Sequence, residues 1–300
     1  MIKIVTDSTC SLDPDDREKY GIRVVPLNVH FGENQTFQEG VTLNNDQFYA
    51  MLAEARELPT TSQPSPGQFL EVISPLTEAG HEVLCIVISS KLSGTYQSAL
   101  DAKDRLPDAN IVVFDSYLVA APLGLMVLTA AEMAANGHAI EEIVARLEQM
   151  RRDMKVYFVV DTLEYLQKGG RIGAAAAFLG TLLKVKPILI LDDGVVKPLD
   201  KVRSKRKALQ RLLSELESHV SPGQPVQAIA MHAQVPDEAR ELEAEIRRRF
   251  NCQRAIFREV GPVVGTHAGP GLLGAGICPE AWPLEMTAVQ EQEARMTLSA

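Results

Sequence analysis

Short runs of Val, Ile and Leu alternate with amphipathic stretches through the first half of the chain. The runs that predict strands span residues 2–6, 22–31, 82–89, 110–115 and 156–161. Residues 44–56 have the i, i+3, i+4, i+7 apolar spacing of a helix with one buried face, and a second helix is expected over 66–76 with Ser65 as its N-cap. Strands that alternate with helices are typical of a mostly parallel sheet covered by helices.

The pattern changes after residue 154. Asp193-Gly194 between two apolar runs predicts a β-hairpin, which is followed by expected helices over 204–219 and 237–250 and strands over 226–232 and 255–260. We interpret the strand at 255–260 as the final ordered strand. We therefore expect an α/β protein of two domains: a mostly parallel sheet with flanking helices in residues 1–154, a smaller α+β domain in 155–277, and a loose tail in 278–300.

The overall composition excludes several classes of protein. With 46% hydrophobic and 23% charged residues, the chain can bury substantial cores. Its formal net charge of −9 disfavours nucleic acid as a partner. The longest apolar stretch, 118–135, contains Pro122, Glu132 and many alanines, which predicts a buried helix and no stable membrane insertion.

The amino-terminal sequence and the cysteines indicate the compartment. The opening MIKIVTDST is strand-like, so we expect no signal peptide. The four cysteines have no CxxC spacing, which predicts neither a zinc site nor a disulfide framework. We expect a cytoplasmic protein that holds no metal. Because only 5% of the residues are aromatic, a large cavity would be lined by aliphatic side chains and would suit an aliphatic ligand.

The sequence IVISSKLSGTYQSA, residues 86–99, is the first candidate binding element. An apolar strand ends there in Ser and Gly residues just before a helix, where ligands of open α/β sheets bind. Free N–H groups at the helix start, the small Gly94 and the Ser93 hydroxyl could hold an anion. The simpler interpretation is that these residues only cap the helix.

Two further segments could bind the same anion. Residues 60–69, TTSQPSPGQF, place the hydroxyls of Thr61 and Ser62 before a helix. Residues 261–276, GPVVGTHAGPGLLGAG, place His267 within a glycine-rich stretch, where an imidazole could complete a carboxylate site. Ordinary helix capping for the hydroxyls, and a local turn hydrogen bond for His267, are the simpler alternatives.

Basic side chains flank a turn in DTLEYLQKGGRIG, residues 161–173. Lys168 and Arg171 lie beside Gly169-Gly170 and could clamp a phosphate, although they could equally be ordinary charges at a helix end. Arg203 opens a second basic cluster at the start of the 204–219 helix, where an acidic partner or a phosphate would relieve the unfavourable dipole interaction.

The usual motifs of hydrolases, nucleotide-binding proteins and metalloenzymes are missing from the sequence. It contains no GxSxG, no GxxxxGK[ST], no HExxH and no Asp-rich cluster. Residue spacing still leaves open an acyl hydrolase with Ser93 as nucleophile, His267 as base and Asp115 as the group that orients it.

Seven ordered motifs resemble the DegV family of bacterial fatty-acid-binding proteins. They are IVTDST, TSQPS, ISSKLSGTYQSA, VFDS, DTLEYLQKGGRIG, LKVKPIL and GPVVGTHAGPG, and the resemblance covers residues 1–277. It implies a two-domain fold that encloses one long-chain, palmitate-like fatty acid and needs no other cofactor.

The resemblance also implies roles for single residues. Thr61 or Ser62, Ser93, the Gly94 backbone and His267 would bind the carboxylate. A separate fatty acid kinase subunit would phosphorylate that carboxylate, with Arg171 at the phosphate or the kinase, and Lys168 and Arg203 as further kinase contacts. A lipid-sensing regulatory protein and the Ser93/His267 hydrolase remain alternatives at this point.

Overall fold

The structure is a computed structural model that describes residues 1–180 and 185–279. Its first sheet is wholly parallel, in the order β2-β1-β6-β7. The four strands are β1 (Ile2–Asp7), β2 (Arg23–Val25), β6 (Glu82–Val87) and β7 (Ile111–Asp115). Helices α3 (Pro66–Glu78) and α4 (Thr95–Lys103) pack on one face of this sheet, and α5 (Ala120–Ala135) packs on the other. The predicted parallel sheet with flanking helices is confirmed.

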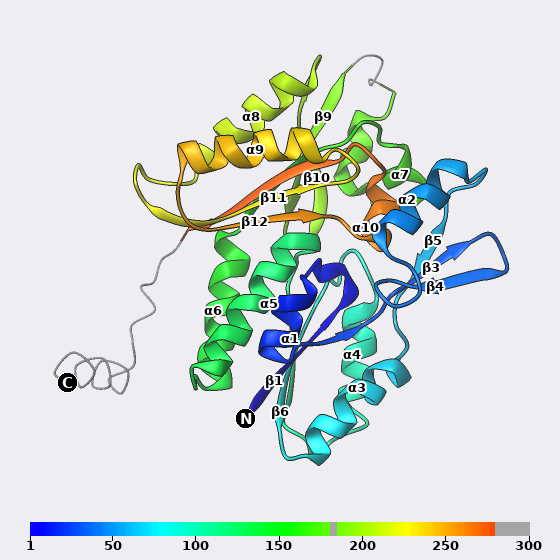
Figure 1. Ribbon diagram of the computed structural model, residues 1–300, viewed down its shortest axis with the longest axis vertical. Coiled ribbons are helices and arrows are strands. Elements are labelled where there is room, and N and C mark those ends of the chain that lie inside the picture. Colours follow the sequence, from blue (N-terminus) through cyan, green and yellow to red (C-terminus); the bar gives the residue numbers. More distant parts are fainter. Residues whose placement is uncertain (181–184, 280–300) are drawn as a thin grey trace.

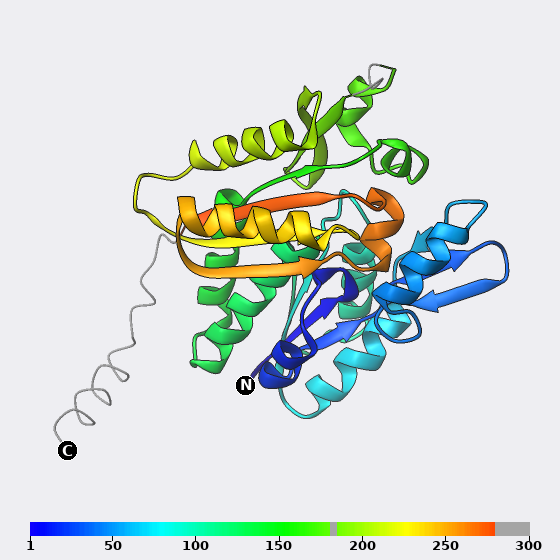
Figure 2. The same ribbon diagram turned by 45° about the horizontal axis from the view of Figure 1, so that its top comes forward.

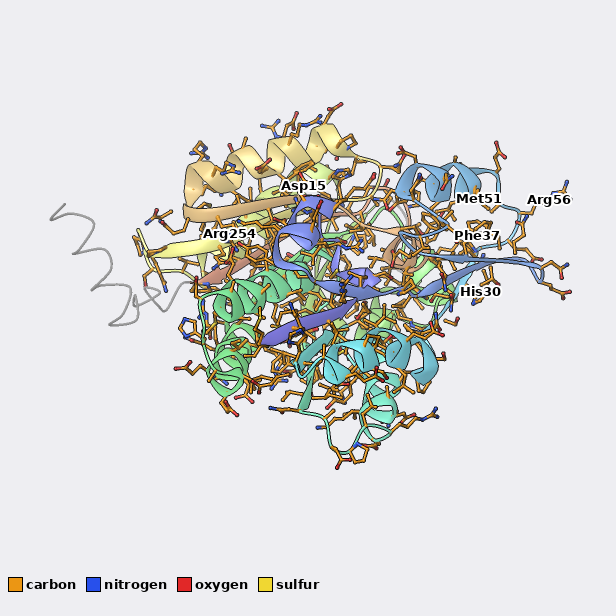
Figure 3. The ribbon with its side chains drawn as sticks, turned by 60° about the horizontal axis from the view of Figure 1, so that its bottom comes forward. Asp15, His30, Phe37, Met51, Arg56 and Arg254 are labelled. Carbon is orange, nitrogen blue, oxygen red and sulfur yellow. The ribbon has the colours of Figure 1, made fainter. Side chains whose placement is uncertain are left out.

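The run at 22–31 is two strands and not one. The chain leaves the first sheet after β2, and Pro26 follows, which has no N–H to continue a ladder. β3 (Asn28–Phe31) then forms a separate antiparallel sheet with β4 (Gln35–Gln38) and β5 (Thr60–Ser62). Together with α2 (Asn45–Glu54) this sheet forms the lobe on which His30, Phe37, Met51 and Arg56 are labelled in Figure 3.

The second large sheet has six strands in the order β10-β9-β8-β13-β11-β12. Only β11 and β12 are parallel neighbours. The strand expected at 156–161 belongs to this sheet as an antiparallel member and not to the parallel one. The strands are β8 (Lys155–Val159), β9 (Lys186–Asp192), β10 (Val195–Val202), β11 (Pro225–His232), β12 (Asn251–Glu259) and β13 (Leu273–Pro279).

Two turn predictions have different outcomes. The β9–β10 hairpin is confirmed, and both turn residues have the positive φ that a type I′ turn needs, 50° at Asp193 and 77° at Gly194. The expectation that the strand near 255–260 is the last one was wrong, because the glycine-rich stretch forms α10 (Pro262–Ala268) and then β13. Cys278 and Pro279 end β13, and the remainder of the predicted tail, 280–300, lies outside the described residues.

The molecule is layered around α5. Helices α8 (Lys205–Glu217) and α9 (Pro236–Arg249) cover the outer face of the six-stranded sheet, and α5 lies between its inner face and the parallel sheet (Figures 1 and 2). One apolar core therefore contains residues of both sheets. An ion pair of 2.5 Å between Glu132 of α5 and Arg254 of β12 also joins this helix to the six-stranded sheet; Arg254 is labelled in Figure 3.

Five further helices complete the described chain. They are α1 (Pro14–Tyr20), α6 (Ile140–Asp153), α7 (Glu164–Lys168) and the 3₁₀ helices η1 (Ser8–Cys10) and η2 (Gly173–Phe178). The predicted boundary at 154/155 falls between α6 and β8, and the division into two domains stays a prediction. In the part of the chain that the structure describes, every helix is too short or too polar to cross a membrane.

Candidate functional site

An apolar cavity lies between the two large sheets, beside the first residues of α5. Its volume is about 110 Å³, measured as the space open to the centre of a water molecule. A single water needs only about 10–15 Å³ by that measure, so the cavity can take a larger guest. Of its 21 lining residues, the 16 apolar ones come from both halves of the chain; they include Leu92, Phe158, Leu191, Met231 and Leu272.

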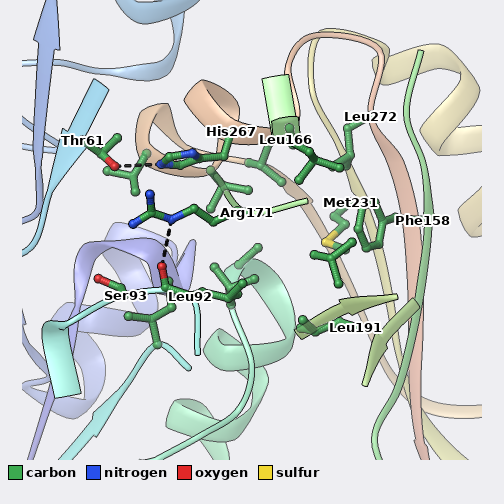
Figure 4. Close-up of a pocket in the computed structure, with 18 of the residues that line it drawn as sticks. Thr61, Leu92, Ser93, Phe158, Leu166, Arg171, Leu191, Met231, His267 and Leu272 are labelled. Carbon is green, nitrogen blue, oxygen red and sulfur yellow. Dashed lines mark hydrogen bonds between the residues drawn. The ribbon is translucent and has the colours of Figure 1, made fainter. Parts of the chain in front are cut away.

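Four polar side chains that can bind an anion gather at one end of this cavity. Thr61 comes from β5, Ser93 from the loop between β6 and α4, Arg171 from the loop after α7, and His267 from the last turn of α10. Figure 4 shows these four on one side of the pocket and the apolar side chains of Phe158, Met231 and Leu191 on the other. The cavity therefore has a polar end and an apolar end.

The imidazole of His267 is held at the polar end from two sides. Its Nε2 is 2.7 Å from Thr61 Oγ1, and its buried Nδ1 has no hydrogen-bond partner. Gly169 makes room for the ring, since a Cβ at that position would lie 2.2 Å from Nδ1. Burial, and then the charge of Arg171, lower the pKa of His267 to about 4, so the ring is neutral at pH 7.

Arg171 supplies positive charge to the same end. Its Nε donates to the carbonyl of Leu92 at 3.0 Å, and its Nη1 donates to the carbonyl of Gly169 at 2.8 Å. No carboxylate among residues 1–180 and 185–279 lies within ion-pair distance of this guanidinium. A half-buried cation beside hydroxyls and a neutral imidazole, with no counter-charge, favours an anionic ligand group.

The structure brings Ser93 to the cavity and leaves Ser62 outside it. Ser93 Oγ lies 2.8 Å from Thr95 Oγ1 at the start of α4. Ser62 follows Thr61 on β5, and because side chains alternate along a strand, its hydroxyl faces the other way and bonds to His30 Nε2 at 3.0 Å. Gly94, the N-cap of α4, lies against the side chain of Gln63, which also lines the cavity.

The two further basic residues lie in different places. Lys168 pairs with Glu164 at 2.6 Å and lines an outer cleft that shares Thr61, Arg171 and His267 with the cavity. The polar end of the cavity thus borders the outer surface. Arg203 is exposed beyond the end of β10 and lines neither the cavity nor this cleft.

The hydrolase arrangement that residue spacing left open is not assembled in this structure. His267 Nε2 bonds to Thr61, whereas Ser93 Oγ bonds to Thr95. Asp115 Oδ1 accepts from the backbone N–H groups of Ser90 and Tyr117 and not from the imidazole. A base that reaches neither its nucleophile nor its orienting acid does not form a catalytic triad.

Sequence reasoning missed a buried acid behind the site. Asp7 ends β1 fully buried, and its Oδ2 accepts from the backbone N–H of Ile88, a lining residue, at 2.7 Å. Its Oδ1 accepts from the hydroxyl and the backbone N–H of Thr9. Burial raises the pKa of Asp7. The signal was an acidic residue at the end of a buried strand in IVTDST, which served above only for the strand, the signal-peptide expectation and the resemblance.

Known proteins similar to this chain support a single family. The sequence profile of the DegV family, whose members are described as uncharacterised proteins, matches residues 1–280. A DegV domain-containing protein of Halalkalibacterium halodurans is 40% identical over 274 residues, which are 91% of this chain and 96% of that protein.

Solved structures agree with the sequence matches. The DegV family protein of Thermus thermophilus, which binds fatty acid, aligns with a TM-score of 0.88 at 36% identity and covers 93% of this chain and 99% of its own. DegV of Bacillus subtilis, a fatty acid binding protein, aligns with a TM-score of 0.83 at 37% identity, with the same coverage of 93% and 99%. The profile match, the identities and the shared fold together show that this chain belongs to the DegV family.

Proposed function

We propose that this protein binds one long-chain fatty acid of the palmitate class, with the acyl chain in the apolar part of the cavity and the carboxylate at its polar end. The observation that carries the proposal is Arg171, which pairs with no carboxylate of the described residues, beside Thr61, Ser93 and His267 at one end of a mainly apolar cavity. Structurally similar DegV proteins that bind fatty acids support it.

The energetics suit such a ligand. At about 0.8 kcal/mol per buried methylene, about fifteen methylenes would contribute on the order of 10 kcal/mol before the cost of ordering the chain. The carboxylate needs donors, because an unpaired buried charge is costly. The hydroxyls of Thr61 and Ser93, the backbone N–H of Gly94, the imidazole N–H of His267 and the guanidinium of Arg171 would supply them. Arg171 is therefore proposed as a carboxylate ligand as well as a phosphate contact.

The bound carboxylate would be presented to a separate fatty acid kinase subunit. The outer cleft next to the polar end supports this role, because it gives a partner access to Thr61, Arg171 and His267 and carries Lys168 at its rim. A carboxylate oxygen would attack the γ-phosphorus of ATP held by the kinase, so that an acyl phosphate forms and ADP leaves. Arg203 would contribute only to docking, since it is remote from the cleft.

Palmitate binding to delipidated variants tests the lipid site. Ser93→Ala and His267→Ala should each weaken the affinity about tenfold, as expected when a hydrogen bond to a charged group is lost. Ser90→Ala, an exposed hydroxyl of the same loop, and Ser62→Ala should bind as the wild type does. Unchanged affinity in both Ser93→Ala and His267→Ala would refute the proposed site.

A second experiment separates the kinase substrate from a lipid sensor. With a fatty acid kinase subunit and ATP, the palmitate-loaded protein should yield an acyl phosphate that hydroxylamine traps. Lys168→Ala should slow this transfer and leave palmitate affinity unchanged. Association with a partner without any acyl phosphate would instead favour the sensor.

A further inference from the structure

The short helix that carries His267 is anchored at its opposite end by a buried acid. Glu39, which follows β4, is 5% exposed, and its Oε1 accepts from the backbone N–H of Val263 in the first turn of α10 at 3.0 Å. Its Oε2 accepts from Ser8 Oγ at 2.5 Å, directly after β1. Gly261 permits this close approach, because a Cβ there would lie 2.4 Å from Glu39 Oε1. Glu39 thus ties α10 to the parallel sheet.

Helix α10 depends on such contacts. It has seven residues, and a helix that short has little stability of its own. Four of its residues line the cavity: Val263, Val264, His267 and Ala268. A shift of its first turn would therefore be transmitted to the imidazole about one turn later.

We propose that Glu39 is a positioning residue for the fatty acid head group, acting through α10 to hold His267 at the polar end of the cavity. This inference rests on the proposed function. Glu39 does not line the lipid cavity itself.

The surroundings of Glu39 make its charge state matter near neutral pH. Burial, and to a smaller extent the neighbouring Asp7, raise the pKa of Glu39 to about 7, against the lowering effect of its bonds from Ser8 and Val263. Other titratable or charged groups also surround Glu39, on or beside η1, α1, α2 and β12. They are Cys10, Asp13, Arg17, Tyr49, Arg258 and Glu259. The loss of a hydrogen-bond donor costs an ionised buried carboxylate more free energy than it costs a neutral carboxylic acid. The ionised form therefore holds the first turn of α10 more firmly.

The test compares palmitate dissociation constants of delipidated wild type and Glu39→Gln from pH 6 to pH 8.5. Glutamine keeps the size and one acceptor but cannot ionise. At pH 8.5 the wild type should bind palmitate about fivefold more tightly than the variant, because a hydrogen bond to a charged group is stronger than one to a neutral group. At pH 6 the ratio of the two dissociation constants should approach one. Titration of His267 or of the ligand is common to both proteins and cancels in this ratio.

Two further variants make the result specific. Glu259→Gln alters a second acid in the cleft that Glu39 lines, which is separate from the lipid cavity and from the outer cleft. Glu259 bonds to Gln234 and Asn45 and not to α10, so the affinity ratio of this variant to wild type should not change with pH. Ser8→Ala removes a donor that lowers the pKa of Glu39. As the pH is lowered, palmitate affinity should therefore begin to weaken at a higher pH in this variant than in the wild type.

The outcomes separate the two claims. Palmitate binding by the wild type together with a Glu39→Gln ratio that is independent of pH would overturn the positioning role and leave the proposed function intact. Absence of palmitate binding by the wild type would overturn both. If Glu39→Gln does not fold, an unmoved pH profile in Ser8→Ala overturns the positioning role by itself.

Discussion

At the residue scale, the site depends on what lies directly behind the ligand-binding groups. The hydroxyl of Thr61 and the missing side chain of Gly169 fix the imidazole of His267 between them. Sequence reasoning selected Thr61, Ser93 and His267 because hydroxyls and imidazoles are natural carboxylate ligands. It could not choose between Thr61 and Ser62, because that choice depends on which way β5 faces.

The packing of Gly169 against His267 gives a first prediction. In Gly169→Ala the new methyl would collide with Nδ1, so the ring must move and palmitate affinity should fall about tenfold, a change comparable to the loss of one hydrogen bond. The control is Gly170→Ala. Gly170 has a φ of 71° and open space around it, so its variant should lose stability through backbone strain and keep its lipid affinity. Equal affinities in the two variants would contradict the role of Gly169.

Glu39 gives a prediction about stability. Its pKa is raised on folding from 4.5 to about 7, so ionisation opposes the folded state: its favourable contribution is complete below about pH 4.5 and is lost as the pH rises through 7. At pH 8, Glu39→Gln should therefore have a free energy of unfolding higher than the wild type by up to about 3 kcal/mol.

Urea unfolding of both proteins at pH 5 and pH 8 measures this difference. The gain should shrink to below about 1 kcal/mol at pH 5, where the side chain is protonated in the folded wild type but still partly ionised in its unfolded state. Other groups, including His267 with its lowered pKa, titrate alike in the two proteins. A variant that is less stable than the wild type at pH 8 would contradict this sign, because it would show that the ionised carboxylate contributes more to folding than its burial costs.

At the element scale, β13 is a strand that the sequence analysis did not predict. Its sequence, LGAGICP, lacks the β-branched alternation that marks a strand, and its glycines read as turn residues. The structure explains them. Leu273, Ala275 and Ile277 face the core beneath α8 and α9, whereas Gly274 faces Met231 and Phe158 at the apolar end of the cavity. That role follows from tertiary packing, which the local sequence does not encode.

Other elements were predictable because their signals are local. Ser65 caps α3 as expected, and Asp193-Gly194 forms the hairpin turn. The same local signals failed at Pro26, where one apolar run is divided between two sheets. They failed again at the glycine-rich stretch, where a helix of seven residues is stabilised by the rest of the molecule.

Gly274 gives a prediction about the choice of ligand. A Cβ at this position would lie 2.6 Å from the Cε of Met231, so Gly274→Val should push Met231 into the apolar end and shorten the cavity. Palmitate should bind at least tenfold more weakly, which corresponds to losing the burial of about two methylenes, while the twelve-carbon laurate should lose less. Competition between the two acids on one protein measures the preference.

The matched control is Ala275→Val. This fully buried residue lies on the opposite face of β13, so its variant is also overpacked but should keep the wild-type preference. The same shift in preference in both variants would show general destabilisation and refute a role for Gly274 in cavity length.

At the scale of the whole molecule, the cavity exists because two sheets share one helix. Strands and loops of both halves line it, and its polar end borders an outer cleft. The fold class could be predicted from the order of strands and helices. The cavity could not, because it is formed between elements that are distant in the sequence.

The most direct test of this account is native mass spectrometry of freshly purified protein, followed by fatty acid analysis of the released ligand. We predict one long-chain fatty acid per chain in the wild type and a much lower occupancy in Arg171→Met, which removes the charge from the polar end and keeps most of the side-chain stem. A wild-type protein that carries no acyl ligand and takes up none from added palmitate would contradict the account.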